Sequence, residues 1–124
     1  METSFILDAL DAAHIDAQLH GHLTTEQLEA ELGRVHRQLI GASRPRAVLL
    51  DCSAMTGYDL AARAVFVEWN RAHRDEISAL AIVVVKPLWF AVIASMALAS
   101  RQTMKAFRHR EDARTWLGLR AVAS

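Results

Sequence analysis

Two short runs of apolar residues constrain the fold of this 124-residue chain more than any other feature. They are Ala47-Val-Leu-Leu50 and Leu80-Ala-Ile-Val-Val-Val85, and neither run alternates with polar residues. A continuous apolar run of this length is typical of a strand that is buried on both faces of a sheet. Residues 60–77 lie between the two runs and have the apolar spacing of an amphipathic helix. A strand, a helix and a second strand in this order predict two parallel strands joined by a right-handed crossover.

Local signals place the ends of the predicted helices. Thr24 and Gln27 have the spacing of a capping box, so we expect a helix to begin there. Gly41 is a typical residue after the last turn of a helix, and Pro45 cannot continue one. Asp59 precedes the second helix and is suited to cap its unpaired backbone amides.

The whole chain predicts one α/β domain spanning residues 1–124. Its length suits a single domain, and 52% hydrophobic residues with 23% charged residues exclude an intrinsically disordered chain. We expect a mixed, mostly parallel sheet of about five strands, with four helices packed on it and the first two strands paired as an edge hairpin. The expected order is strand-strand-helix-strand-helix-strand-helix-strand-helix, over residues 3–10, 14–23, 24–40, 47–50, 60–77, 80–85, 87–103, 104–108 and 110–119.

Charge and cysteine content exclude several classes of protein. Equal numbers of basic and acidic residues, 14 of each, argue against binding to nucleic acid by bulk electrostatics. A basic cluster near the C-terminus has no interleaved aromatic platform, so we expect no nucleic-acid partner. One cysteine cannot form an internal disulfide. The basic cluster consists of Arg101, Lys105, Arg108, Arg110 and Arg114.

Two segments of the sequence bear on where the protein is located. Met1 to Leu10 has acidic residues and no basic segment before a long apolar one, so no secretory signal is expected. Residues 80–99 are the most membrane-like window, but Lys86 and Pro87 divide it into parts too short to span a bilayer. We therefore expect a cytoplasmic protein without a membrane span.

No arrangement of residues predicts an active site, a cofactor or a metal. Asp51 follows a buried strand, at the edge where open α/β sheets bind ligands. The simpler interpretation is that its carboxylate accepts hydrogen bonds from backbone amides of the next turn. Cys52 has no basic neighbour in sequence to activate its thiol, so a structural cysteine is expected. A hydrolase that uses Asp51 and Cys52, or the pair His20 and His22, is therefore the least favoured hypothesis.

The six histidines do not predict a metal or catalytic site either. His20 and His22 are expected on one face of a strand, where two imidazoles could bind a metal, but no further ligands accompany them. A solvated strand face is the simpler interpretation of this pair. The other histidines are scattered, without a Ser-His-Asp or Cys-His order; they are His14, His36, His73 and His109.

The third predicted helix has no charged residue from Leu88 to Ser100. A helix that covers a sheet needs an apolar stripe on one side only, so part of this one should face away from the sheet. A second copy of the chain, a partner protein or an apolar ligand would then cover it, unless the chain buries the helix completely. A second copy is our preferred hypothesis, with Trp89 and Met96 as anchors. The expected interaction surface consists of Trp89, Phe90, Ile93, Met96 and Leu98.

The order of elements and several local motifs resemble the STAS superfamily of sulphate transporters and anti-sigma-factor antagonists. Within it the chain is most similar to the SpoIIAA-like proteins, which are also compared with lipid-carrier domains of the CRAL-TRIO type. The resemblance runs over about residues 5–119 and implies the fold expected above. The matching motifs are Gly21-His-Leu-Thr-Thr-Glu-Gln27, Val48-Leu-Leu-Asp51, Gly57-Tyr58, Ala79-Leu-Ala-Ile-Val83, Phe107 and Glu111-Asp-Ala-Arg-Thr-Trp-Leu117.

The resemblance also implies a regulatory site that this chain has lost. In members that are phosphorylated, a kinase modifies a serine at the start of the second helix, and the added charge controls release of a partner. Here the matching stretch is Asp59-Leu-Ala-Ala62, without a hydroxyl group. Ser53 and Thr56 are nearby but lie a few residues too early. We therefore expect a degenerate switch loop formed by Asp51, Ser53, Thr56, Tyr58 and Asp59.

Taken with the missing catalytic residues, the resemblance implies a non-enzymatic signalling or adaptor domain that acts through protein contact, as a homodimer through the third helix. The alternative is a carrier or sensor of a small apolar ligand such as a lipid, which the comparison with lipid carriers and the same apolar helix favour.

Overall fold

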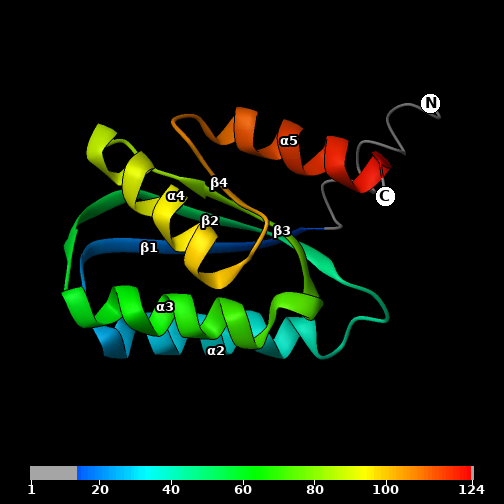
Figure 1. Ribbon diagram of the computed structural model, residues 1–124, viewed down its shortest axis with the longest axis horizontal. Helices are drawn as coiled ribbons and strands as arrows, with labels where there is room; N and C mark the ends of the chain where they lie inside the picture. The colour runs from blue at the N-terminus through cyan, green and yellow to red at the C-terminus, as the bar shows by residue number, and fades with distance from the viewer. Residues whose placement is uncertain (1–13, 124) are drawn as a thin grey trace.

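The structure, a computed structural model, describes residues 14–123 and is built on a four-stranded sheet (Figure 1). The strand order is β1-β2-β3-β4, and every neighbouring pair is parallel. The predicted strand over residues 3–10 and its hairpin lie outside the described residues, so the described sheet has four strands rather than about five. The strands are β1 (His14–Leu23), β2 (Arg46–Tyr58), β3 (Ile77–Val83) and β4 (Met104–Phe107).

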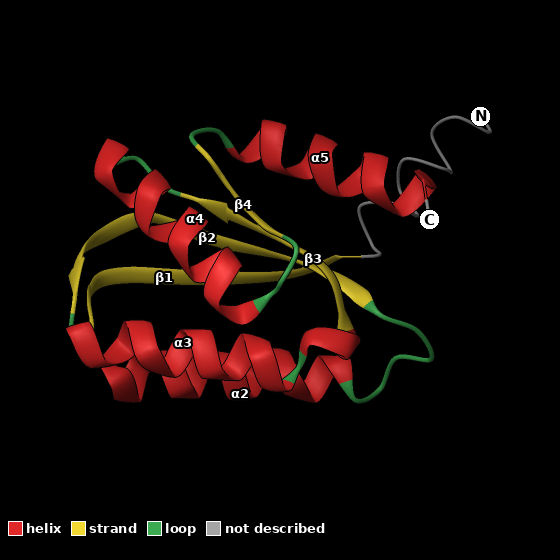
Figure 2. Cartoon of the chain, in the orientation of Figure 1, coloured by secondary structure: helices red, strands yellow, loops and turns green. Residues whose placement is uncertain are grey.

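Four helices cover the two faces of this sheet (Figure 2). Right-handed crossovers that advance a sheet in one direction place their helices on the same face. Accordingly, α2, α3 and α4 share one face, and α5 alone packs on the other. The helices are α2 (Thr25–Leu39), α3 (Leu60–Ala72), α4 (Pro87–Ser100) and α5 (Arg110–Ala123), and a short 3₁₀ turn, η1 (Arg74–Glu76), follows α3.

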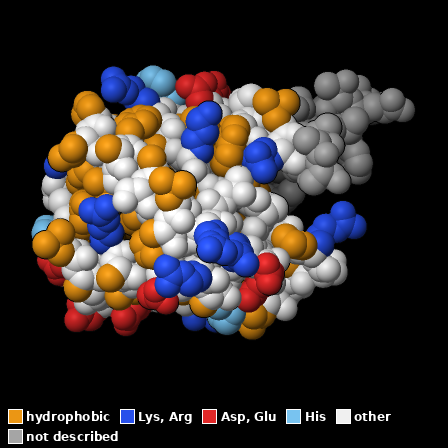
Figure 3. Space-filling model, viewed as in Figure 1, with side chains coloured by type: hydrophobic (Ala, Val, Ile, Leu, Met, Phe, Trp, Pro, Cys, Tyr) orange, Lys and Arg blue, Asp and Glu red, His pale blue; other side chains and the backbone are white. Residues whose placement is uncertain are grey.

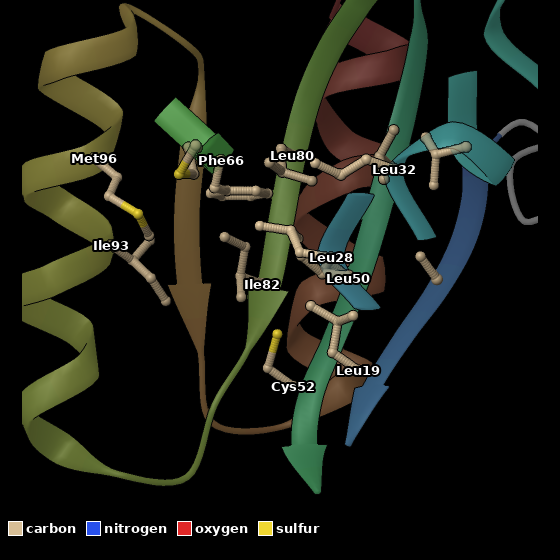
Figure 4. Packing of buried hydrophobic residues seen from close by; sticks show 14 of the residues in the cluster. Leu19, Leu28, Leu32, Leu50, Cys52, Phe66, Leu80, Ile82, Ile93 and Met96 are labelled. Carbon is tan, nitrogen blue, oxygen red and sulfur yellow. The ribbon is translucent and has the colours of Figure 1, made fainter. Parts of the chain in front are cut away.

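The continuous apolar runs lie in the central strands, which are buried on both faces as predicted. In β2, Leu50 faces the three-helix layer and Leu49 faces α5. In β3, Ile82 faces the three helices and Ala81 faces α5. Figure 4 shows part of the larger core, in which side chains from all four strands and from α2, α3 and α4 meet. Each large aliphatic side chain buried there contributes about 1.5–3 kcal/mol to stability.

The helix signals are confirmed only in part. The backbone amide of Gln27 donates to the Thr24 hydroxyl at 3.2 Å, and the Thr24 amide donates to the Gln27 side chain at 3.0 Å, so the capping box is present. The end of α2 differs from expectation, because Ile40 is the C-cap residue in a right-handed conformation. Gly41 does not have the positive φ of a left-handed cap; among the described glycines, Gly21 does.

The second strand is much longer than the predicted residues 47–50. β3 pairs with β2 only as far as Asp51, opposite Val83, but β1 pairs with β2 as far as Tyr58, opposite Leu23. Residues 52–58 therefore continue as a two-stranded ribbon beyond the main sheet. Two register shifts interrupt this ribbon, one between Gln18 and His20 and one between Gly21 and His22. The stretch expected to be a loop is thus an irregular strand, because a neighbouring strand pairs with its backbone.

Candidate interaction surface and switch region

The inner side of α4 belongs to the core of its own chain. Ile93 and Met96 are 4% and 9% exposed, and Figure 4 shows both pointing from α4 towards the sheet. At about 100° per residue these two positions lie on one side of the helix, together with the buried Ser100. The expectation that Ile93 and Met96 form part of an outer surface therefore needs correction.

The opposite side of α4 is exposed and carries no charge. Leu98 is 83% exposed, and Leu88, which was not among the expected surface residues, is 74% exposed. Ala91 and Ala94 lie between them and are also exposed. These four residues share one side of the helix, and we call them the outer face of α4. Figure 3 shows hydrophobic side chains, with some Lys and Arg among them, gathered over the half of the molecule where α3 and α4 begin.

Two arginines of α3 border the outer face of α4. The Arg63 guanidinium donates to the Ser95 hydroxyl at 3.2 Å. The Arg71 guanidinium donates to the backbone carbonyl of Ala99 at 2.8 Å. These bonds tie the two helices together along their length. They also give the apolar stripe a polar rim, which is the usual arrangement of a protein interface.

Trp89 and Phe90 are half-buried at the first turn of α4. The Trp89 ring meets the Tyr58 ring edge-on, with centroids 5.7 Å apart. The Lys86 ammonium lies 4.9 Å from the Trp89 ring centroid, a cation–π distance. Lys86 also donates to the backbone carbonyl of Thr56. The start of α4 is therefore fixed against the end of β2 rather than free in solvent.

A small apolar cavity lies beside these aromatic rings, between the sheet and the helices α2, α3 and α4. Its volume is about 70 Å³. Half-buried Tyr58, Arg63 and Trp89 lie at its rim. An apolar cavity of about 150 Å³ is sufficient for benzene, so this one is too small for a lipid chain unless α4 moves. Deeper lining residues include Leu19, Met55, Phe66, Ile93 and Met96.

Asp51 is held by hydrogen bonds within the fold. Its Oδ1 accepts from the Ser53 amide at 3.0 Å and from the Ser53 hydroxyl at 2.6 Å, and its Oδ2 accepts from Arg110 at 3.3 Å. Burial raises the pKa of Asp51, but the bonds from Ser53 and the Arg110 charge outweigh burial and hold the pKa below its ordinary value. Arg110 also contacts Asp16 in β1. Arg110 at the start of α5 thus joins Asp51 of β2 to Asp16 of β1, which favours the structural interpretation of Asp51.

Cys52 is not an activated nucleophile. Its side chain is buried in the larger core. Burial, with a smaller contribution from the Asp51 charge, raises the pKa of the Cys52 thiol to about 12. A thiol of this pKa is almost entirely protonated at neutral pH, and the thiolate is the reactive form. The arrangement of Asp51 and Cys52 therefore supports no hydrolytic chemistry.

The start of α3 differs from a phosphorylated switch in its residues and its contacts. Asp59 is the N-cap residue, but its side chain does not cap the helix as expected. Its carboxylate is bonded instead to Nε2 of His22 at 2.7 Å. Leu60 follows and is 80% exposed. Ser53 and Thr56 lie in β2, and the Ser53 hydroxyl already donates to Asp51.

His20 and His22 of β1 are exposed, as expected for a solvated strand face, but two of the other histidines are not scattered. His22 pairs with Asp59, and His20 is exposed on β1, so the pair does not form a joint site. His36 and His73, expected to be scattered, lie with their ring centroids 4.5 Å apart. Glu76 lies within 4.0 Å of both. The only sequence signal for this cluster was the three-residue spacing of His73 and Glu76, because the contact with His36 depends on how α2 and α3 pack.

A family model matches most of the chain, and a solved structure shares its fold. A family model described as SpoIIAA-like matches residues 14–118. The chain is also similar to the crystal structure of an uncharacterized protein of the DUF3478 family with a SpoIIAA-like fold from Shewanella loihica PV-4. The TM-score is 0.66 with 24% identity over 82% of each chain, a likeness that shows the fold alone. No curated protein matches the chain. No helix within residues 14–123 is long and apolar enough to cross a membrane.

Proposed function

The chain belongs to the SpoIIAA-like family, and from this premise we propose that it is a non-enzymatic regulatory domain of the STAS type that acts through protein contact. In this proposal the outer face of α4 binds a second copy of the chain. The resulting homodimer is the form that presents the domain to further protein partners in the cytoplasm.

One observation carries the proposal, namely the exposure of an uncharged helix side. Leu88 and Leu98 are the ends of a stripe whose middle residues, Ala91 and Ala94, are small enough for a second helix to approach closely. Exposing two leucines on one stripe is unfavourable in water, and a contiguous apolar patch is a common mark of an interface. The rim formed by Arg63 and Arg71 supports the same interpretation.

The bonds of Asp51, the raised pKa of Cys52 and the family support a role without catalysis. The start of α3 supports a domain that is not switched by phosphorylation there, since residues 59–62 carry no hydroxyl. A phosphate on Ser53 would stand beside the Asp51 carboxylate, which like-charge repulsion disfavours. Regulation would then act through the amount of protein or its dimerisation.

The molar mass of the protein in solution tests this proposal. Size-exclusion chromatography with light scattering should give a dimer for the wild type and a monomer for Leu98→Glu, because two charges would be buried in the interface. Ile40→Glu is the matched control, since Ile40 is 65% exposed but follows α2. A wild type that stays monomeric at all concentrations contradicts the proposal. Equal effects of the two substitutions contradict it as well.

A second candidate function is a carrier or sensor of a small apolar ligand, and the cavity beside Trp89 favours it. Its size weighs against this role, because about 70 Å³ would have to grow severalfold before a drug-sized or lipid ligand fits. Native mass spectrometry of freshly purified protein decides between the two functions. A stoichiometric co-purifying lipid favours the carrier, and bare protein at the dimer mass favours the contact domain.

A further inference from the structure

A cluster of three polar side chains lies at the end of the helix layer where α2 and α3 both terminate. His36 lies in the last turn of α2, His73 is the C-cap residue of α3, and Glu76 lies in η1. The cluster is separate from the outer face of α4. The proposed function does not use it, so the inference below does not depend on that proposal.

The geometry of this cluster is close to that of a metal site. His73 Nδ1 lies 3.1 Å from one Glu76 carboxylate oxygen, and His36 Nε2 lies 4.0 Å from the other. One donor atom from each residue can be chosen so that all three lie within 4.8 Å of one another. Tetrahedral zinc with bonds of about 2.0–2.2 Å needs ligand atoms roughly 3.4 Å apart. Small rotations of these side chains therefore suffice to bring the three donors onto one ion.

The surroundings hold the donors in place without closing the site. The His73 ring packs on the Trp69 ring, with centroids 4.8 Å apart. The side chains of His36 and Glu76 are each 39% exposed, and that of His73 is 20% exposed. Three protein donors with one side open to solvent leave a fourth position for water or another ligand.

The donor set selects the class of ion. Two imidazoles and one carboxylate suit zinc and neighbouring transition metals, whereas calcium and magnesium prefer sites made of oxygen atoms. We infer that His36, His73 and Glu76 form a binding site for a divalent transition-metal ion of the zinc class. The bound ion connects the last turn of α2 to the end of α3 and to η1, which follows α3 directly in the chain.

The simpler alternative is that Glu76 only pairs with the two histidines, and a metal titration distinguishes the two. Untagged protein is titrated with zinc in a non-chelating buffer by isothermal calorimetry. We expect one saturable site per chain, and His36→Gln and His73→Gln should each weaken it at least about tenfold. His20→Gln is the matched control, because His20 is exposed and outside the cluster. Magnesium should give no saturable binding.

A stability measurement and a third variant complete the test. Zinc should raise the thermal unfolding midpoint of the wild type and of His20→Gln but not of the cluster variants. Glu76→Gln replaces the carboxylate with an amide of the same size and serves where a histidine variant fails to fold. It should also weaken zinc binding. The inference is overturned by the absence of saturable binding. It is also overturned by zinc binding that persists in His36→Gln and His73→Gln, or that His20→Gln weakens equally.

Discussion

The helices α4 and α5 pack on opposite faces of the sheet, and their outer sides differ in charge. Each buries one side: α4 packs Ile93 on the three-helix face, and α5 packs Leu117 on the other. The outward side of α5 carries Glu111, Asp112 and Arg114, whereas that of α4 carries no charge. A charged outer side suits a helix that faces water. The uncharged side of α4 indicates a helix that another layer covers.

Both helices are nevertheless fixed to the fold by polar contacts. Arg110 at the start of α5 pairs with Asp51 and Asp16, and two arginines of α3 bond to α4. The difference between them is therefore not one of attachment. It lies in what each helix presents outward.

The largest expected effect concerns the inner side of α4, beneath which Cys52 lines the cavity. Because the pKa of this thiol is about 12, its reaction with a thiol reagent at pH 8 should be slower than that of a free thiol by a factor on the order of 10³. The rate is measured by absorbance. The double variant Cys52→Ser, Leu98→Cys provides an exposed thiol as control. Equal rates would mean that α4 opens readily.

The next largest effect is expected for the buried side chains by which the two helices pack on the sheet. Ile93→Ala and Leu117→Ala should each lower the free energy of unfolding by about 2–4 kcal/mol, because each leaves a cavity in a packed core. Denaturant unfolding at low protein concentration measures this without the contribution of self-association. A cost well below 1 kcal/mol for Ile93→Ala alone would show that α4 is packed less firmly than α5.

A smaller effect concerns the attachment of α5. Asp51→Asn should cost about 1–2 kcal/mol, because charge-assisted bonds to Ser53 and Arg110 are weakened. The pKa of Asp51 is lower in the folded protein, so its contribution is full above the unfolded value near 3.8. The contribution is lost as pH falls below that value towards the folded pKa. As the pH falls from 5 to below 3.8, the wild type should therefore lose more free energy of unfolding than Asp51→Asn. Identical dependence of this free energy on pH in the two proteins would contradict this role.

The smallest expected effects are on the outer sides. Leu98→Ser in α4 and Leu119→Ser in α5 should each change the stability of the monomer by less than about 0.5 kcal/mol, because both side chains are exposed. Only Leu98→Ser should abolish the rise of the unfolding midpoint with protein concentration that a dimer shows. Calorimetry at two concentrations measures both. If the wild-type midpoint does not depend on protein concentration, the proposed difference between the outer sides of α4 and α5 is contradicted.

Much of the fold could be predicted from the sequence because it depends on local patterns. The continuous apolar runs were correctly interpreted as central strands, and Thr24 with Gln27 correctly marked the start of α2. The family resemblance is likewise confirmed. The length of β2 could not be predicted, because pairing with β1, a distant segment, extends it to Tyr58 through two register shifts.

The candidate site could be predicted only where it depends on the sequence of α4 alone. The absence of charge in α4 indicated an outward apolar side, but the sequence did not tell which residues lie there. Ile93 and Met96 face inward because of where β4 and α3 lie against the helix. Asp59 bonds to His22, and His36 meets His73, across contacts that join residues 37 positions apart. Such pairs depend on tertiary packing and leave no local pattern.

The central claim is that a second copy covers the outer face of α4, and isotope-filtered NMR tests it most directly. In a mixture of isotope-labelled and unlabelled protein, intermolecular NOEs report only contacts between copies. We predict such NOEs from the methyl groups of Leu88 and Leu98 and none from Leu119. Intermolecular NOEs confined to α5, or none at concentrations where the protein is dimeric, would contradict the account.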